Sequence, residues 1–362
     1  MATPELLLLA LQTVIDPNTG RDFVSTKQIK NLRVEGVQVS FDVELGYPAK
    51  SQIPALRSAL TAAAKGVAGV ESVSANVSVN IVAHAAQMGV ALLPQVKNIV
   101  AVASGKGGVG KSTTAVNLAL ALAAEGAKVG LLDADIYGPS QPMMMGIEGR
   151  PDSEDGKTME PMEHYGVQVM SIGFLVNQDE AMIWRGPMAT QALEQLLRQT
   201  NWKELDYLIV DMPPGTGDIQ LTLSQRVPMT GAVIVTTPQD IALLDAKKGI
   251  KMFEKVGVPI LGLVENMAVH VCTNCGHVEH IFGADGGKKM AAEYGMDYLG
   301  ALPLNMQIRV QADSGKPTVV ADPEGEMAQI YKAMARQVAV KIAAKAKDFS
   351  SKFPSIKISK DT

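Results

Sequence analysis

Hydrophobic and polar residues alternate strictly in two segments near the start of the chain. From Val37 to Leu45 the odd positions are apolar and the even positions polar, and Val73 to Ile81 repeat this pattern. A period of two is typical of a half-buried strand. Between these segments, apolar residues recur at helical spacing from Ile53 to Val67. With a short buried helix over Leu6 to Leu11, this predicts a small α-β-β-α-β domain with a partly antiparallel sheet over residues 1–85.

The rest of the chain alternates short, almost continuous apolar runs with helical patterns. Such runs are typical of a mostly parallel sheet covered by helices on both faces, with ligand-binding loops at the C-terminal ends of the strands. We therefore expect an α/β fold with a doubly wound, mostly parallel sheet over 98–347, after a linker at 86–97 and before a tail at 348–362. The predicted strands are Ile99–Ala103, Val129–Leu132, Val167–Ile172, Tyr207–Val210, Ala232–Val235, Ile260–Val264 and Tyr298–Ala301.

A glycine-rich loop follows the first of these strands and precedes a helical pattern. A strand that turns through glycines into a helix directs several backbone N–H groups and the positive end of the helix at one point, where a phosphate binds. Lys111 supplies a cation for the β- and γ-phosphates, and Ser112 supplies a hydroxyl for Mg²⁺. We expect ATP to bind the motif residues Gly105, Lys106, Gly107, Gly108, Val109, Gly110, Lys111, Ser112 and Thr113.

The same glycines also fit a dinucleotide-binding motif. Gly105, Gly107 and Gly110 spell G-x-G-x-x-G, and Asp133 follows roughly 20 residues later. The lysine after the third glycine favours a nucleoside triphosphate, because a dinucleotide site needs no charge at that position.

Two other predicted strands end in aspartates. Asp133 and Asp135 follow one strand, and Asp211 ends another, just before a Pro-Pro-Gly-Thr-Gly segment. Phosphoryl transfer needs Mg²⁺ held by oxygen ligands, a positioned water and N–H donors for the γ-phosphate. We expect Asp211 to hold Mg²⁺ together with Ser112 and Asp133. Asp135 is expected to orient the attacking water, and the Gly215 N–H to contact the γ-phosphate.

Cys272 and Cys275, the only two cysteines, are separated by two residues. Thiolates at this spacing can hold one metal centre, but a 4Fe-4S cubane or structural Zn²⁺ needs four ligands. Either two chains bring two thiolates each to a shared centre, or histidines complete a zinc site in one chain, or the pair is a redox disulfide. The candidate histidines are His270, His277 and His280, of which His277 lies cramped against Cys275 for the usual ligand spacing.

Composition narrows the class of protein. The chain has 362 residues, a net charge of −4, and 47% hydrophobic but only 4% aromatic residues. This suits an α/β protein with a large core and offers no global field for nucleic acid or an anionic membrane. Two cysteines are too few for a disulfide framework, and we expect a cytoplasmic location. The predicted helix over Glu324 to Lys347 could lie on a membrane surface, but docking onto the sheet is the favoured interpretation.

The motifs together resemble the Mrp/ApbC family of iron–sulfur cluster carrier proteins over about Lys97 to Ala343. The resemblance rests on the phosphate loop and on Asp133–Ser140, Trp184–Met188, Asp211–Asp218 and the Cys272/Cys275 pair. It implies a homodimer that binds a labile 4Fe-4S cluster between two cysteine pairs, hydrolyses ATP, and exchanges the cluster with assembly scaffolds and apoproteins. It implies no nucleic-acid or membrane partner.

Lys106, directly after the first glycine of the loop, resembles the signature lysine of the deviant Walker A motif in the MinD/ParA superfamily. In that superfamily this lysine reaches across a dimer to the neighbour's nucleotide, which makes Lys106, with Lys111 and Asp135, a candidate catalytic residue. The superfamily places an adenine contact at the position of Asn266. Two alternatives remain: a MinD/ParA-like positioning switch driven by ATP, and a cluster-bridged ATP-dependent reductase resembling the nitrogenase iron protein.

Residues 1–85, with Ile15-Asp16-Pro17, resemble the small iron–sulfur assembly-type domain found fused to many Mrp proteins. Relatives of that domain often carry a cysteine where this chain has the segment 46–51, Gly-Tyr-Pro-Ala-Lys-Ser. The resemblance therefore gives the domain no evident metal ligand of its own.

Overall fold

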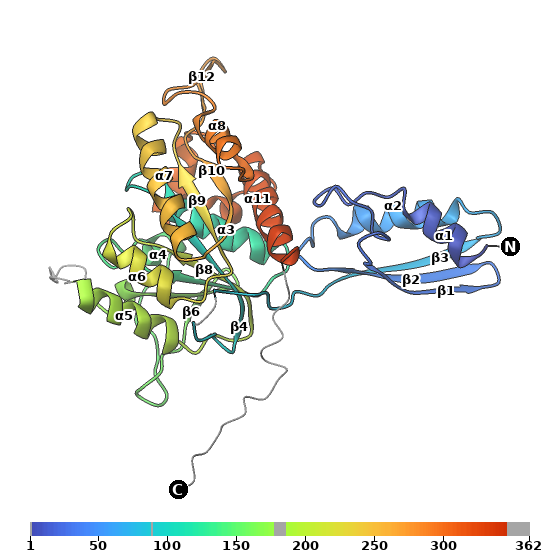
Figure 1. Ribbon diagram of the computed structural model, residues 1–362, viewed down its shortest axis with the longest axis horizontal. Helices are drawn as coiled ribbons and strands as arrows, with labels where there is room; N and C mark the ends of the chain where they lie inside the picture. The colour runs from blue at the N-terminus through green and yellow to red at the C-terminus, as the bar shows by residue number, and fades with distance from the viewer. Residues whose placement is uncertain (1, 88–89, 177–185, 346–362) are drawn as a thin grey trace, which may run out of the picture.

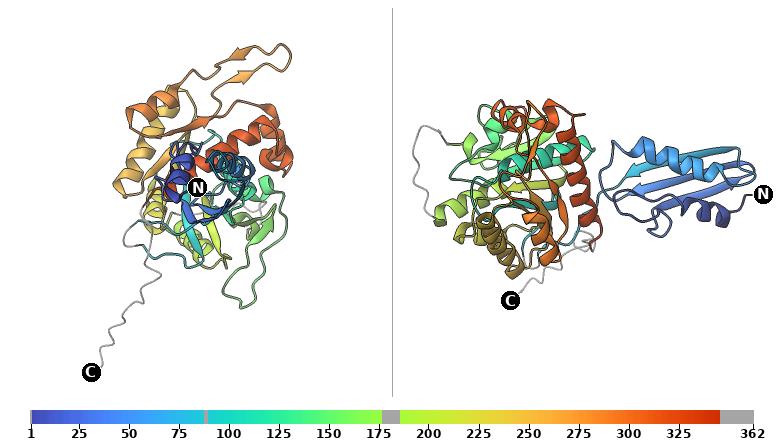
Figure 2. Two further views of the ribbon diagram at one scale, coloured as in Figure 1. Left: turned by 90° about the vertical axis from the view of Figure 1, so that its right-hand side faces the viewer. Right: turned by 90° about the horizontal axis from the view of Figure 1, so that it is seen from above.

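The computed structural model describes residues 2–87, 90–176 and 186–345, which form sheets of three, eight and two strands. In the smaller domain, β1 and β2 pair antiparallel while β2 and β3 pair in parallel, so the predicted partly antiparallel sheet is confirmed. The small domain projects from the larger one (Figures 1 and 2). Its elements are α1 (Pro4–Leu11), β1 (Ile29–Glu35), β2 (Gln38–Leu45), α2 (Ile53–Lys65) and β3 (Ser72–Val79).

The first helix is only half buried, so the expectation of a buried helix was wrong in part. Leu7 and Leu11 are fully buried, whereas Leu6 and Leu9 are 48% and 62% exposed. Residues four apart share one face of a helix, and α1 offers only the Leu7/Leu11 face to the domain core. The sequence does not show which face is buried, because the run of four leucines makes the helix apolar on every side.

The larger domain contains an eight-stranded sheet in the order β13-β10-β9-β4-β8-β5-β7-β6. All pairings are parallel except that of β6 with β7, and the seven predicted strands are confirmed. The strands are β4 (Val96–Ala103), β5 (Val129–Asp133), β6 (Met162–His164), β7 (Val167–Ser171), β8 (Leu205–Asp211), β9 (Gly231–Thr236), β10 (Ile260–Glu265) and β13 (Tyr298–Ala301). β4 begins two residues before the domain boundary expected from the sequence.

Helices cover both faces of this sheet (Figure 1). α3 packs against β4, β5 and β8 and also against α11, while α7 and α8 pack against β9 and β10. The helices are α3 (Lys111–Ala124), α4 (Gln141–Met145), α5 (Gly186–Arg198), α6 (Asp218–Arg226), α7 (Asp240–Lys255), α8 (Gly286–Glu293), α9 (Met306–Asp313), α10 (Thr318–Ala321) and α11 (Glu326–Ala343), with a 3-10 turn at Ile172–Phe174.

The last helix docks onto the domain, as the favoured interpretation predicts. Its apolar face, which includes Met334, Val338 and Ile342, is buried against α3, β10 and β13. Lys332 is buried as well and donates to the Pro323 carbonyl at 2.7 Å. No helix in the described ranges is both long and apolar enough to cross a membrane.

Candidate functional site

The phosphate loop lies between β4 and α3, where the sequence predicts it. β4 is buried up to Ala103, and α3 begins at Lys111 with Gly110 as its N-cap. Gly108 and Gly110 both have φ of +81°, a left-handed conformation that only glycine adopts without strain. The loop therefore presents backbone N–H groups at the N-terminus of a buried helix, the geometry of an anion site.

Two glycines of the loop are required by close contacts as well. A Cβ on Gly105 would lie 2.1 Å from the backbone carbon of Asp245 in α7. A Cβ on Gly110 would lie 2.1 Å from the side-chain nitrogen of Asn266. The loop is thus wedged between α7 and the end of β10, which holds its backbone in place.

Lys111, Asp211 and Asp135 meet beneath the loop. The Lys111 Nζ lies 2.5 Å from Asp211 Oδ1 and 3.9 Å from Asp135 Oδ2. The exposed fractions of the three side chains are 6%, 0% and 13%. Burial raises the pKa of Asp135, and the charge of Lys111 opposes this rise. The structure therefore brings together the predicted cation, the predicted Mg²⁺ ligand and the predicted water-orienting carboxylate.

Asp133 lies beside Asp211 but is engaged with the backbone. The two residues are register partners on β5 and β8. Asp133 Oδ2 accepts hydrogen bonds from the backbone N–H groups of Ser140 and Gln141 and from the Ser171 hydroxyl, at 3.0 to 3.1 Å. Burial, and then the neighbouring charge of Asp211, raise the pKa of Asp133 to about 7. Its visible role is to hold the segment that follows β5.

Gln141 is a site residue that the sequence reasoning missed. Its Nε2 donates to Asp211 Oδ2 at 2.8 Å and to the Ser112 carbonyl at 3.1 Å. Its Oε1 and the Ser140 hydroxyl are buried without a hydrogen-bond partner in the described residues. The signal for Gln141 in the sequence is weak, since this residue follows a Gly-Pro-Ser segment and lies six residues beyond Asp135.

Gly215 and Asn266 both contact the phosphate loop. The Gly215 N–H donates to the Ser104 carbonyl at 3.0 Å, so the amide predicted to meet the γ-phosphate is bonded within the protein. Asn266 Nδ2 donates to the Val109 carbonyl at 2.8 Å. The adenine contact predicted for Asn266 stays a prediction, and the visible role of its side chain is to support the loop.

Lys106 is half-buried, and its Nζ has no ion pair with the residues that the structure describes. The backbone carbonyl of Lys106 accepts from the Ser104 hydroxyl at 2.8 Å. The reach of this lysine into a partner's site stays a prediction. Trp184 and Arg185, which contribute to the family resemblance, lie outside the described residues.

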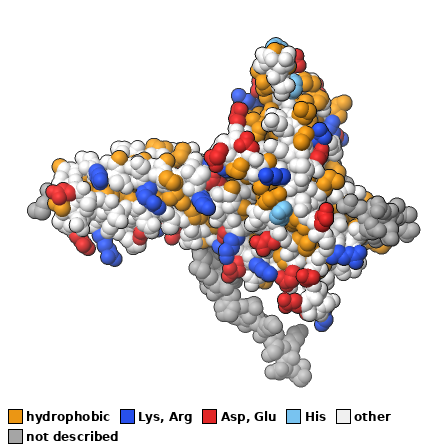
Figure 3. All heavy atoms as spheres, turned by 180° about the vertical axis from the view of Figure 1, so that it is seen from behind, with side chains coloured by type: hydrophobic (Ala, Val, Ile, Leu, Met, Phe, Trp, Pro, Cys, Tyr) orange, Lys and Arg blue, Asp and Glu red, His pale blue; other side chains and the backbone are white. Residues whose placement is uncertain are grey.

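The two cysteines lie in the turn of a short hairpin. This hairpin projects from the larger domain (Figures 1 and 3). β11 (His270–Val271) and β12 (Val278–Glu279) pair antiparallel, and the Cys272 N–H donates to the His277 carbonyl at 2.9 Å. Cys275 is exposed and Cys272 is partly exposed, and both are free thiols. Backbone N–H groups of Cys275 and then Asn274 lower the pKa of Cys272. This turn favours a thiolate that can bind metal.

The predicted zinc alternative finds no support in the described part of the chain, where no three His, Cys, Asp or Glu side chains group closely enough to hold a metal ion. His277 is 68% exposed and lies 3.8 Å from Glu279. His270 and His280 each use Nδ1 to contact a backbone carbonyl.

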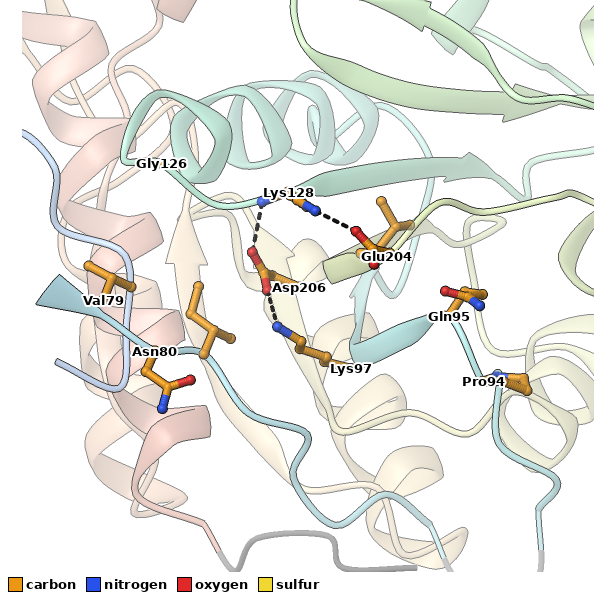
Figure 4. A pocket seen from close by; sticks show the side chains of 11 residues that line it. Val79, Asn80, Pro94, Gln95, Lys97, Gly126, Lys128, Glu204 and Asp206 are labelled. Carbon is orange, nitrogen blue, oxygen red and sulfur yellow. Dashed lines mark hydrogen bonds and ion pairs between the residues drawn. The ribbon is translucent and has the colours of Figure 1, made fainter. Parts of the chain in front are cut away.

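A cavity of about 530 Å³ lies away from these residues, between the small domain and the N-terminal edge of the large sheet (Figure 4). Its charged side chains are already paired. Asp206 accepts from Lys97 Nζ at 2.7 Å, and Lys128 pairs with Glu204 at 2.7 Å. The ligand loops of a parallel sheet lie at the opposite, C-terminal edge, so the phosphate loop remains the stronger candidate site.

Comparison with known proteins agrees with this geometry. A family model described as "NUBPL iron-transfer P-loop NTPase" matches residues 95–339, and one described as "Iron-sulfur cluster assembly protein" matches residues 5–77. The chain belongs to the iron-transfer P-loop NTPase family. The family resemblance drawn from the motifs is therefore confirmed.

The relatives of this chain are named as carrier or transfer proteins for iron–sulfur clusters. The chain is 62% identical over 269 residues to the "Iron-sulfur cluster carrier protein" of Pseudomonas fragi, covering 74% of this chain and 94% of that protein. It is 44% identical over 348 residues to the carrier protein of Synechocystis, covering 95% and 99%. The mouse "Iron-sulfur cluster transfer protein NUBPL" is 55% identical over 245 residues, 67% of this chain and 77% of that protein.

Solved structures share the fold of the larger domain. A nucleotide-binding protein from Archaeoglobus fulgidus in complex with ADP is 38% identical, with a TM-score of 0.56 over 64% of this chain and 91% of that one. The cell-division ATPase MinD of Pyrococcus furiosus is 22% identical, with a TM-score of 0.50 over 67% and 98%, which shows the fold alone. The predicted doubly wound fold of this family is thereby confirmed.

Proposed function

We propose that this protein is an ATP-hydrolysing carrier of iron–sulfur clusters, which holds a labile 4Fe-4S cluster between two copies of the chain and passes it to apoproteins. The observation that carries the proposal is the pair of free, accessible thiols on a hairpin that projects from a P-loop NTPase domain. The names of the relatives support the choice of cargo.

The dimer follows from counting ligands. A cubane needs four, and thiolates are its ordinary ligands. Cys272 and Cys275 supply two, so a two-fold axis through the cluster would supply the other two. The exposed apolar side chains around the thiols, Val271, Val278 and Ile281, would be covered in such a pairing.

The residues beneath the loop fit ATP and Mg²⁺. Lys111 and the N–H groups of the loop would hold the phosphates. Ser112 and Asp211 would hold Mg²⁺, which offsets the charge of the phosphates when it is bound. The unpartnered Gln141 oxygen beside them supports this fit, because a buried polar atom calls for a hydrogen-bond partner such as an ion-bound water.

The remaining roles concern the attacking water and the charge that develops during hydrolysis. Asp135 would orient the water, and Lys106 would stabilise charge in the partner's site. Asp133 acts by holding the segment that carries Asp135 and Gln141. Asn266 would complete the nucleotide pocket. The positioning-switch alternative would need an amphipathic anchor, and the candidate that the sequence offers for it, α11, has its apolar face buried against the domain.

Two variants test the proposal. With oxygen excluded, we expect Cys272→Ala to lose bound iron and sulfide and to transfer no cluster to an apo-acceptor, while ATP hydrolysis continues. We expect Lys111→Gln, which keeps a long polar side chain over Asp211, to lower ATP hydrolysis by at least about a hundredfold. Thr273→Ala, in the same turn, is the matched control and should transfer normally.

Iron and sulfide per dimer, an absorption spectrum and sedimentation before and after ATP complete the measurement. Undiminished transfer by both Cys272→Ala and Lys111→Gln would refute the proposal. A wild-type protein that stays monomeric with and without cluster would refute the shared site.

A further inference from the structure

The cysteine hairpin is too small to fix its own orientation. β11 and β12 are two residues each and pair at only two positions, His270 with Glu279 and Val271 with Val278. An isolated two-stranded hairpin is marginally stable at best in water. The position of Cys272 and Cys275 therefore depends on the bonds that join the base of the hairpin to the domain.

Two histidines supply such bonds, one at each side of the base. His270 Nδ1 lies 3.2 Å from the Leu304 carbonyl oxygen, and His280 Nδ1 lies 3.0 Å from the Ala268 carbonyl oxygen. A carbonyl oxygen only accepts hydrogen bonds, so both Nδ1 atoms carry the proton and donate it. The hairpin between residues 270 and 280 is thus held on both strands.

Both acceptors belong to a short ladder that continues beyond β10 and β13. The Ala268 N–H donates to the Leu302 carbonyl at 3.0 Å, and the Leu304 N–H donates to the Val269 carbonyl at 2.8 Å. The same ladder segment begins with Asn266, whose Nδ2 donates to the Val109 carbonyl of the phosphate loop. Between Asn266 and Ala268, Met267 has a φ of +56°, a strained conformation for this residue.

These contacts form one continuous connection. It runs from Val109 through Asn266 to Ala268, crosses to His280, and reaches the thiols. We propose that His270 and His280 are positioning residues that couple the nucleotide loop to the cysteine hairpin, an inference that rests on the proposed carrier function. A shift of the loop on ATP binding moves the Asn266 segment, and the two histidine bonds carry this movement to the paired thiols.

The coupling predicts a loss of nucleotide response without a loss of ATP hydrolysis. For wild type, the rate of cluster transfer is measured with and without ATP, and their ratio is the response. We expect His270→Phe and His280→Phe each to change this ratio about fivefold in the direction of one. Fivefold is about the equilibrium factor for the loss of one neutral hydrogen bond. ATP hydrolysis should stay at the wild-type rate.

Two kinds of variant separate positioning from damage to the fold. His270→Asn and His280→Asn keep an N–H donor near the Nδ1 position and should restore the response. His277→Phe is the matched control, because this histidine is on the same hairpin and its ring lies 3.8 Å from Glu279 of that hairpin, with no hydrogen bond from the ring to the rest of the domain among the described residues. An unchanged ratio in both Phe variants, or an equal loss in His277→Phe, would overturn the inference. If a Phe variant takes up no cluster, its Asn counterpart decides: a restored response supports the inference and a missing one overturns it.

A second readout is independent of the cluster. In the cluster-free protein, backbone hydrogen exchange of residues 270–281 should differ between the nucleotide-free and ATP-bound states, and the Phe variants should lose this difference. If hydrogen exchange in the wild-type hairpin is the same with and without ATP, the coupling is overturned, even where cluster transfer proceeds. A wild-type protein that holds no cluster but shows the exchange difference refutes the carrier function and leaves the coupling standing.

Discussion

Asp133 and Cys272 show how opposite surroundings shift the pKa of an acidic side chain in opposite directions. Asp133 is fully buried beside Asp211, and burial raises its pKa to about 7. Cys272 lies near the surface, where backbone N–H groups of Cys275 and Asn274 point at its sulfur and lower its pKa. The first environment favours the protonated form and the second favours the anion. The Cys272 thiol is thus suited to bind a metal as a thiolate, whereas the Asp133 carboxyl is suited to accept hydrogen bonds from the backbone.

The lowered pKa of Cys272 predicts its reactivity. In the metal-free, reduced protein, the alkylation rate of Cys272 should rise with pH around a midpoint below that of the same thiol in urea-unfolded protein, because the N–H donors that stabilise the thiolate exist only in the folded turn. Mass spectrometry of the modified peptide gives the rate. Identical midpoints in folded and unfolded protein would show that the turn does not stabilise the anion.

At the scale of elements, the sequence predicts the helices, strands and loops that carry a hydrophobic period or a motif. It misses features that depend on packing between residues far apart in the chain. Buried parallel strands are continuous apolar runs, so β4, β5 and β8 were predictable, and with them the meeting of Lys111, Asp135 and Asp211 at neighbouring strand ends. β6 was missed because three residues at a sheet edge carry no readable period. Gln141 and the Asn266–Val109 contact were missed because tertiary packing alone determines where those side chains reach.

The segment after β8 is the element most directly poised to sense nucleotide. Gly215 has a φ of +96°, and its N–H is bonded to the Ser104 carbonyl at the base of the phosphate loop. A γ-phosphate would compete for this donor as a charged and therefore stronger acceptor. We expect the amide proton signal of Gly215 to move downfield in nuclear magnetic resonance spectra with a non-hydrolysable ATP analogue but not with ADP. The Gly257 amide, in a distant loop, is the control; equal shifts of Gly215 with both nucleotides would exclude the sensor role.

At the scale of the whole molecule, the two domains meet on the far end of the helix that starts at the phosphate loop. Glu125, the C-cap of α3, has a fully buried carboxylate that accepts from Arg336 of α11 at 2.5 Å. The same carboxylate accepts from the Ser51 hydroxyl at 2.7 Å and the Ser51 N–H at 3.0 Å. Arg336 also donates to Asn18. One buried ion pair of the larger domain is thus completed by two residues of the smaller one. Figure 2 shows the small domain beside α11, the red helix.

This arrangement predicts that the domain joint opens when the pair is broken. Arg336→Ala leaves the Glu125 carboxylate buried without its cation, which costs about 3 kcal/mol or more. An undocked small domain would let water reach Glu125 and relieve this cost, so the docked and undocked forms should interconvert. We expect the radius of gyration from small-angle X-ray scattering to increase and the distance distribution to broaden. Arg309→Ala, which removes an exposed arginine paired within α9, is the control and should leave the scattering unchanged. Identical curves for Arg336→Ala and wild type would mean that the joint between the domains does not depend on the Arg336–Glu125 pair.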